Sequence, residues 1–191
     1  MIHRTFIKKN ILYKYWGLRK IKFGKLGKNV RVSLPISFGN PQNIYIEDNV
    51  FIGTECYFNA LSDIIISEGT MIGPRCIFVS SNHNYNSEGL LAVPYDNYIY
   101  DKKIIIEKNV WIGAGVVISP GTIIREGAVI AAGTCIYGEI PSFSIVGSSK
   151  YRIIKERNKE QYLELAKNGK IYNKIFAGKP FIMKDDNHEN N

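Results

Sequence analysis

A repeat of six residues constrains this chain more than any other feature of its sequence. Between Ile104 and Ile136, an aliphatic side chain takes the third place in six successive six-residue blocks. These side chains are Ile106, Ile112, Ile118, Ile124, Ile130 and Ile136. A period of six is typical of a β-solenoid whose coils are triangles of three short strands, with one residue of each side pointing to the axis. Gly, Asn or a charged residue ends the blocks, where a positive φ is cheap only for Gly or Asn.

The pattern extends towards the N-terminus. Axis positions fall at Val32, Phe38, Ile46, Ile52, Phe58, Ile66, Ile72 and Phe78, six residues apart except for two steps of eight. Grouped in threes, the axis positions predict an all-β solenoid of about five triangular coils over residues 30–150. The large step from Phe78 to Ile106 inserts a loop, residues 80–103, at one corner.

The loop 80–103 holds the candidate for chemistry. Long loops without structure of their own are uncommon on a rigid scaffold and are usually functional. This one contains His83, whereas the other two histidines, His3 and His188, lie in the terminal segments. His83 comes five residues after the axis position Phe78, where the chain leaves the solenoid, so we expect a functional role for it.

Positive charge gathers at the N-terminal end. The net charge is +8, and residues 1–46 contain ten Lys or Arg and no Asp or Glu. In the segment 1–29 apolar residues interleave with the bases at about helical spacing, without a run long enough to span a membrane or a signal cleavage site. We predict an amphipathic segment that binds an anionic membrane surface or an anionic substrate, or that caps the solenoid. Nucleic acid is disfavoured because no recognition motif accompanies the charge.

The cysteines and the C-terminal region suggest no further chemistry. Cys56 and Cys76 each precede an axis Phe by two residues, so they should stack as free thiols in the core. A zinc site needs more ligands than they supply, and we expect no metal. Residues 151–184 predict a helical extension that begins near Ile153, with Gly169 as a stop signal. The tail, residues 185–191, is predicted to be disordered.

Three stretches resemble hexapeptide-repeat acyltransferases, whose fold is a left-handed parallel β-helix. They are F78-V-S-S-N-H-N, N109-V-W-I-G-A-G-V-V-I-S-P-G and the ending I140-P-S-F-S-I-V-G-S-S-K-Y-R. In that ending, Ser148, Ser149 and Lys150 stand where the family typically has a small residue, Pro and Ala. The similarity covers about residues 30–152 and is greatest to sugar and polysaccharide O-acetyltransferases and to xenobiotic acetyltransferases.

The resemblance implies an enzyme that uses acetyl-CoA to acetylate a sugar hydroxyl, in surface polysaccharide or glycan modification, with His83 as general base. The coenzyme would lie beside Trp111, Gly113, Ala114, Ala131 and Ala132, with Lys150 and Arg152 for its phosphates. The acceptor would meet Asn59, Asn82, Tyr85, Glu88 and Trp111. It also implies a homotrimer in which His83 of one chain and Trp111 of its neighbour share a pocket, and a cytoplasmic location, at the inner face of the membrane if the basic segment binds lipid.

Structural alternatives stand beside several of these roles. Gly113 and the alanines would equally serve coil packing, and Trp111 a subunit contact. Asn59 could simply turn a corner, and Asn82 could initiate the loop.

Other functions remain open at this point. An amino-sugar N-acetyltransferase or a xenobiotic acetyltransferase would use the same base, and a non-catalytic scaffold would keep the solenoid without the chemistry. The γ-type carbonic anhydrases, which share the fold, bind zinc through three histidines. This use is disfavoured because only His83 lies on the scaffold.

Overall fold

The chain divides into two compact units. The computed structural model describes residues 20–148, 157–175, 179 and 182–183. Unit 1 covers Met1–Ser80 and Lys102–Ser148, and unit 2 covers Ser81–Asp101 and Ser149–Asn191. Unit 1 therefore contains the six-residue repeat, and unit 2 contains the predicted loop with the C-terminal extension. Most of the basic segment, residues 1–19, and the tail 185–191 lie outside the described residues.

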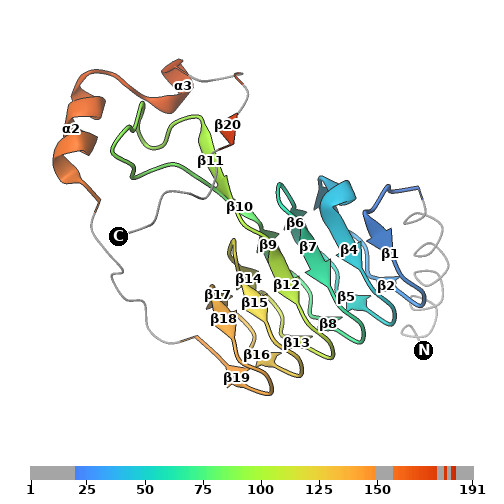
Figure 1. Cartoon of the computed structure of the whole chain (residues 1–191). Coiled ribbons are helices and arrows are strands. Elements are labelled where there is room, and N and C mark those ends of the chain that lie inside the picture. The colour runs from blue at the N-terminus through green and yellow to red at the C-terminus, as the bar shows by residue number, and fades with distance from the viewer. Residues whose placement is uncertain (1–19, 149–156, 176–178, 180–181, 184–191) are drawn as a thin grey trace, which may run out of the picture. The chain divides into compact units, whose positions relative to one another are not determined.

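Unit 1 is a parallel β-solenoid with three sheets (Figure 1). The first sheet contains β1 (Lys25–Leu26), β4 (Ile44–Ile46), β7 (Ile64–Ile66), β12 (Ile104–Ile106), β15 (Ile123–Ile124) and β18 (Glu139–Ile140). The second contains β2 (Arg31–Val32), β5 (Phe51–Ile52), β8 (Met71–Ile72), β13 (Trp111–Ile112), β16 (Val129–Ile130) and β19 (Ile145–Val146). The third contains β3 (Ser37–Gly39), β6 (Tyr57–Asn59), β9 (Ile77–Val79), β14 (Val117–Ile118) and β17 (Cys135–Ile136). A 3₁₀ turn, η1 (Pro41–Asn43), fills the first of the eight-residue steps.

The predicted axis residues form the core of unit 1. All of them are buried except Phe38, which packs partly buried against the others. The prediction of a hexapeptide-repeat β-helix is confirmed, but the solenoid has about six turns rather than five. The extra strands are β1 before Val32, and β18 and β19 after Ile136. β18 and β19 were missed because Ile140 follows Ile136 by four residues instead of six, which breaks the pattern.

One corner of the solenoid shows why Asn and Gly end the blocks. Where the chain passes from the first sheet to the second, one residue of every coil has a left-handed backbone. These residues are Asn29, Asn49, Gly69, Asn109, Gly127 and Phe143, with φ between 53° and 75°. Gly and Asn adopt this conformation at little cost. Phe143, in the last coil, is the exception and is 77% exposed.

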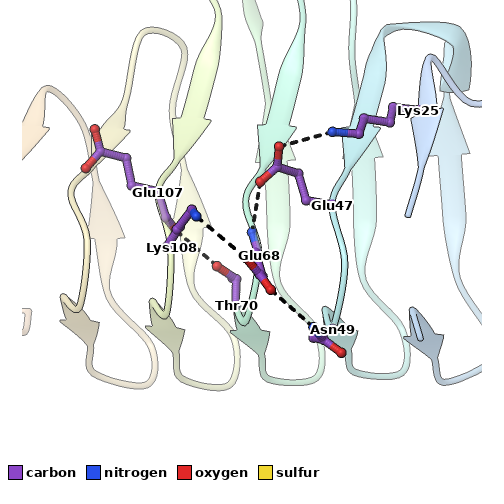
Figure 2. A network of polar contacts seen from close by, with 7 residues as sticks. All are labelled: Lys25, Glu47, Asn49, Glu68, Thr70, Glu107 and Lys108. Carbon is purple, nitrogen blue, oxygen red and sulfur yellow. Dashed lines mark hydrogen bonds and ion pairs between the residues drawn. The ribbon is translucent and has the colours of Figure 1, made fainter. Parts of the chain in front are cut away.

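Charged side chains link neighbouring coils at the same corner (Figure 2). Glu47 accepts hydrogen bonds from Lys25 Nζ at 3.2 Å and from the backbone N–H of Glu68 at 3.2 Å. Glu68 in turn accepts from Asn49 at 3.3 Å and pairs with Lys108 at 3.6 Å. The contact with Lys25, followed by the Glu68 N–H, lowers the pKa of Glu47. Because these groups are largely exposed, each pair stabilises the fold by at most about 1 kcal/mol.

Aromatic rings fill the first coils. Phe58 and Phe78 stack with centroids 4.3 Å apart and planes 6° apart, and Phe38 stacks on Phe58 at 5.2 Å. Phe23 meets Phe38 edge-on at 5.0 Å, and Ile21 also packs against the core. The first coil is thus covered by residues 21–23, which lie within the predicted basic segment but carry its apolar side chains.

Unit 2 contains a three-stranded sheet and two helices. Its strands are β10 (Ser81–His83), β11 (Tyr98–Asp101) and β20 (Ile182–Met183), and its helices are α2 (Lys159–Lys167) and α3 (Tyr172–Ile175). The predicted C-terminal helix is therefore present over Lys159–Lys167, and residues 153–156 of the predicted range lie outside the described residues. Asn158 begins α2 by accepting the Gln161 N–H at 2.9 Å, and Gly169, with φ of 64°, follows its end as predicted.

No helix within the described ranges is both long enough and apolar enough to cross a membrane.

Cys56 and Cys76 are free, buried thiols, as predicted. Their Sγ atoms lie 3.3 and 3.1 Å from the carbonyl oxygens of Gly73 and Gly113, one coil further on. The neighbouring Cys76 thiol and burial raise the pKa of Cys56, so this thiol stays protonated.

Candidate active site

The loop predicted to be structureless is a β-hairpin. β10 pairs antiparallel with β11, with Ser81 opposite Asp101, Asn82 opposite Tyr100 and His83 opposite Ile99. β20 adds to the other edge of β11 as a parallel strand. At the base of the loop, the N–H of Lys102 donates to the carbonyl of Ser80 at 2.8 Å, so the chain leaves and rejoins the solenoid at one place. The regular backbone gives the side chains of the hairpin defined directions.

His83, the predicted base, lies at the end of β10 and is half-buried. Its imidazole stacks on the ring of Tyr95, with centroids 4.0 Å apart and planes 15° apart. Burial lowers the pKa of His83 below its ordinary value. The ring is therefore uncharged at neutral pH, and an uncharged imidazole is the form that accepts a proton.

Three predicted acceptor residues surround His83 in sequence. Asn82 is exposed, and its Oδ1 accepts the backbone N–H of His83 at 2.9 Å. Tyr85 has an exposed ring, whereas its carbonyl accepts a hydrogen bond from Arg157. Glu88 is exposed, and its carbonyl accepts Gln161 Nε2 at 3.0 Å. The structure thus keeps all three on the hairpin unit and leaves the side chains of Asn82, Tyr85 and Glu88 at its surface.

The start of α2 holds the tip of the hairpin loop. Arg157 donates to the carbonyls of Tyr85 and Pro94, the second at 3.0 Å. Its guanidinium carbon lies 4.9 Å from the centroid of the Tyr162 ring. Gln161 Nε2 also donates to the carbonyl of Ser87 at 3.0 Å. The C-terminal extension therefore fixes both arms of the loop that carries His83, a role that the sequence did not suggest.

The residues predicted to bind the coenzyme lie in unit 1. Trp111, on β13, is 60% exposed and pairs with Met71 and Val129 in the neighbouring strands. Ala114 and Ala132 are exposed at the same corner of adjacent coils, where the N–H of Gly133 donates to the carbonyl of Ala114 at 2.8 Å.

Gly113 has a packing role. A Cβ on Gly113 would lie 2.6 Å from the backbone nitrogen of Ala132 in the next coil, so a larger residue would push the coils apart. Ala131, which follows Gly113 in the same column, is exposed. The side chains of Ala114, Ala131 and Ala132 are small and exposed at the edge of the last coils.

Asn59 ends β6, between Gly39 and Val79 in its sheet. As predicted, its neighbour Phe58 stacks on Phe78. The carbonyl of Asn59 accepts the backbone N–H of Ser80 at 3.0 Å, and its half-buried side chain lies near Gly39. Its backbone therefore holds the residue from which the hairpin departs.

Two predicted phosphate ligands, Lys150 and Arg152, lie outside the described residues. Within the described part of the chain, no group of three or more His, Cys, Asp or Glu side chains could hold a metal ion.

Known proteins with similar sequences or folds agree with this architecture. A family model described as the hexapeptide repeat of succinyl-transferase matches residues 103–137. A comparison with curated proteins finds no match. Among solved structures, a hexapeptide-repeat acetyltransferase from Vibrio cholerae O1 biovar eltor, in complex with acetyl-CoA, is 28% identical with a TM-score of 0.64. The match covers 75% of this chain and 76% of that one.

Two further structures carry sugar names. A maltose O-acetyltransferase from Clostridium difficile 630 is 27% identical, with a TM-score of 0.63 over 82% of this chain and 87% of that one. A galactoside acetyltransferase in complex with coenzyme A is 27% identical, with a TM-score of 0.64 over 83% of this chain and 75% of that one.

Proposed function

We infer that this hexapeptide-repeat acyltransferase moves an acetyl group from acetyl-CoA to a sugar hydroxyl, with His83 as the general base. The observation that carries the proposal is the half-buried imidazole of His83, stacked on Tyr95, on a hairpin inserted into the solenoid. Similar structures solved with acetyl-CoA or coenzyme A support the donor. The maltose and galactoside acetyltransferases support a sugar as the acceptor.

The chemistry needs one proton transfer in each direction. As the acceptor oxygen bonds to the thioester carbonyl carbon, the imidazole takes the hydroxyl proton. When the tetrahedral intermediate breaks its C–S bond, the imidazolium returns that proton to the departing thiolate. Because Nδ1 of His83 is buried, we assign the base to Nε2. No covalent acyl-enzyme is needed, and the buried thiols of Cys56 and Cys76 take no part.

The small, exposed residues at the edge of the last coils suit the coenzyme. A Cβ at Gly115 or Gly133 would meet nothing within 4 Å, so this edge is open. We propose that the pantetheine arm lies along Ala114, Ala131 and Ala132, with Lys150 and Arg152 at the phosphates and Trp111 as a wall of the acetyl pocket. For the acceptor, we propose contacts from Asn59, Asn82, Tyr85 and Glu88.

The outer surface of the second sheet supports a trimer. Met71, Trp111 and Ile145 are 42%, 60% and 79% exposed and follow one column of that sheet. Apolar surface in this arrangement is typical of a protein contact. We propose that three copies assemble, with His83 of one chain and Trp111 of the next in one pocket.

Release of coenzyme A thiol tests the activity directly. With acetyl-CoA and a panel of oligosaccharides and nucleotide sugars, we expect acceptor-dependent thiol release and a product heavier by one acetyl group, followed with a thiol reagent and by mass spectrometry. Acetylation of an amino sugar alone would favour the N-acetyltransferase. Binding of neither acetyl-CoA nor any acceptor would favour the scaffold and contradict the proposal.

The basic segment is proposed to bind the inner face of the membrane from the cytoplasm. Residues 1–19 contain five Lys or Arg and no acidic residue. Each such charge near an anionic membrane contributes about 1 kcal/mol. We expect deletion of residues 1–19 to weaken binding to phosphatidylserine vesicles by at least about tenfold in a sedimentation assay. The deletion keeps Ile21 and Phe23, so the core remains covered.

Neutral phosphatidylcholine vesicles and high salt are the controls for this assay, since electrostatic binding needs anionic lipid and is screened by salt. Equal binding of the full and shortened chains to anionic vesicles would exclude the membrane role and leave an anionic substrate or a cap on the solenoid as the role of the segment.

A further inference from the structure

A buried polar pair in unit 2 has no part in the chemistry described above. Asp96 is fully buried and Asn84 is 1% exposed. The Asp96 carboxylate accepts three hydrogen bonds: Oδ2 accepts from Asn84 Nδ2 at 2.8 Å and from the Leu91 N–H at 3.3 Å, and Oδ1 accepts from the Tyr98 N–H at 3.0 Å. A buried carboxylate is costly unless such donors satisfy it, so this one must contribute something to the hairpin.

The pair joins the two arms of the loop twice. Besides the side-chain bond, the backbone N–H of Asp96 donates to the carbonyl of Asn84 at 3.1 Å. Asn84 is held in turn by its own N–H, which donates to the carbonyl of Tyr98 at 3.0 Å, and by Nδ2, which also donates to Ser87 Oγ at 2.8 Å. Little freedom remains at residues 84 and 96.

Each member of the pair follows, in sequence, one of the two stacked rings of His83 and Tyr95. His83 precedes Asn84, and Tyr95 precedes Asp96. His83 ends β10, whereas Tyr95 and Asp96 lie in the loop before β11. The rings of His83 and Tyr95 are partly exposed and stack on each other, whereas Asn84 and Asp96 are buried. Because residues 84 and 96 are bonded to each other, the buried polar pair fixes the spacing of the two rings that precede them in sequence.

We propose that Asp96 is a positioning residue that, through Asn84, holds the imidazole of His83 against Tyr95. The inference rests on the proposed function, in which that imidazole is the base. Asp96 does not touch the reacting atoms. A base displaced by about 1 Å loses on the order of 10²-fold in rate, so the hydrogen bond between Asp96 and Asn84 matters to turnover and not only to folding.

Asp96→Asn tests the proposal with almost no change in shape. Both carboxylate oxygens accept hydrogen bonds, so the NH₂ group of the amide faces one of the present donors and at least one of these bonds is lost. We expect kcat to fall about 10²-fold while KM for acetyl-CoA changes by less than about twofold. Asp101→Asn makes the same chemical change in the same hairpin, at a carboxylate that is not bonded to Asn84 or Asp96. It should leave kcat and the KM for acetyl-CoA unchanged.

A second readout does not depend on activity. In histidine-labelled protein, the Cε1–H signal of His83, assigned by its loss in His83→Ala, carries the ring-current shift of Tyr95. In Asp96→Asn we expect that shift to disappear and the pKa of His83 to rise towards its ordinary value as the ring becomes solvated. If kcat falls while the shift stays, Asp96 does not act by positioning, and the proposal is overturned. It is equally overturned if neither changes.

This readout separates the two proposals. If the wild type transfers no acetyl group but Asp96→Asn loses the ring-current shift, the proposed function fails and the positioning of His83 stands. If Asp96→Asn does not fold, Asn84→Ala replaces it, because it removes the side-chain link but leaves the two backbone donors on Asp96 and the backbone bond between residues 84 and 96. The same loss of shift then supports the proposal, and its retention contradicts it.

Discussion

Replacing His83 with alanine is expected to lower kcat by about 10²- to 10⁴-fold, because the attacking hydroxyl then loses its base. At 1.36 kcal/mol for each factor of ten, this is a loss of about 3 to 5 kcal/mol of transition-state stabilisation. Steady-state thiol release measures the change. The affinity for acetyl-CoA, measured by calorimetry, should stay within about twofold, since the coenzyme is proposed to bind the edge of the solenoid instead.

The pH dependence of the rate is expected to identify His83 as the group that titrates. Burial lowers the pKa of His83, so the imidazole is unprotonated at neutral pH. The wild-type kcat/KM should therefore be level near pH 7 and should fall only at pH values below the ordinary pKa of about 6.5, as the base becomes protonated. In His83→Ala the residual rate should lack this acidic limb.

His188→Ala is the matched control, because it removes a histidine to which no role is assigned. It should keep both the wild-type rate and the acidic limb. Full activity in His83→Ala with an unchanged pH profile would exclude His83 as the base, whatever acceptor is used.

The solenoid was predictable because the three-sided geometry of each coil requires a fixed spacing of inward-facing residues in the sequence. Ile106, Ile112 and Ile118 repeat every six residues since one inward residue is needed on each side of the triangle. The left-handed corner was predictable in the same way, because Asn49 and Gly69 occupy the positions where the backbone has a positive φ. Besides the two steps of eight and the insertion after Phe78, the pattern fails at the C-terminal end, where β18 follows β17 after a shorter step.

The hairpin could not be predicted in the same way. β10 and β11 are separated by fourteen residues without a short turn motif, and their pairing is a tertiary effect. His83 stood out because a histidine is chemically distinctive. Its ring partner, Tyr95, and the buried Asp96 did not, since aromatic and acidic residues in a loop usually face solvent. The signal available was an Asp between the buried apolar residues Ala92, Val93 and Ile99.

Gly113 shows where a functional and a structural interpretation separate. Similarity places it beside the coenzyme, yet a Cβ there would collide with the backbone of the next coil. Gly53 and Gly73 occupy the same column and meet the same obstacle. Packing thus explains the glycines, whereas the exposed Ala131 and Ala132 remain residues for which we propose contact with the coenzyme.

Phe78→Ala is expected to lower the free energy of unfolding by about 3 to 5 kcal/mol, the largest stability effect we predict. The ring is fully buried and stacks on Phe58 with centroids 4.3 Å apart. Its removal leaves a cavity between Phe58 and Ile118, which neighbour it in the sheet. Backbone pairing along the coils prevents the walls from closing this cavity. Urea unfolding followed by circular dichroism, at one protein concentration, measures the loss.

Phe143→Ala makes the same substitution on a ring that is 77% exposed, at the αL position of the last coil. This variant should stay within about 0.5 kcal/mol of the wild type, as surface substitutions usually do. The difference between the two variants isolates the contribution of the stacked core from that of an aromatic ring as such. Equal unfolding midpoints for Phe78→Ala and Phe143→Ala would mean that the phenylalanine column does not hold the coils together, and that the aliphatic columns alone carry the solenoid.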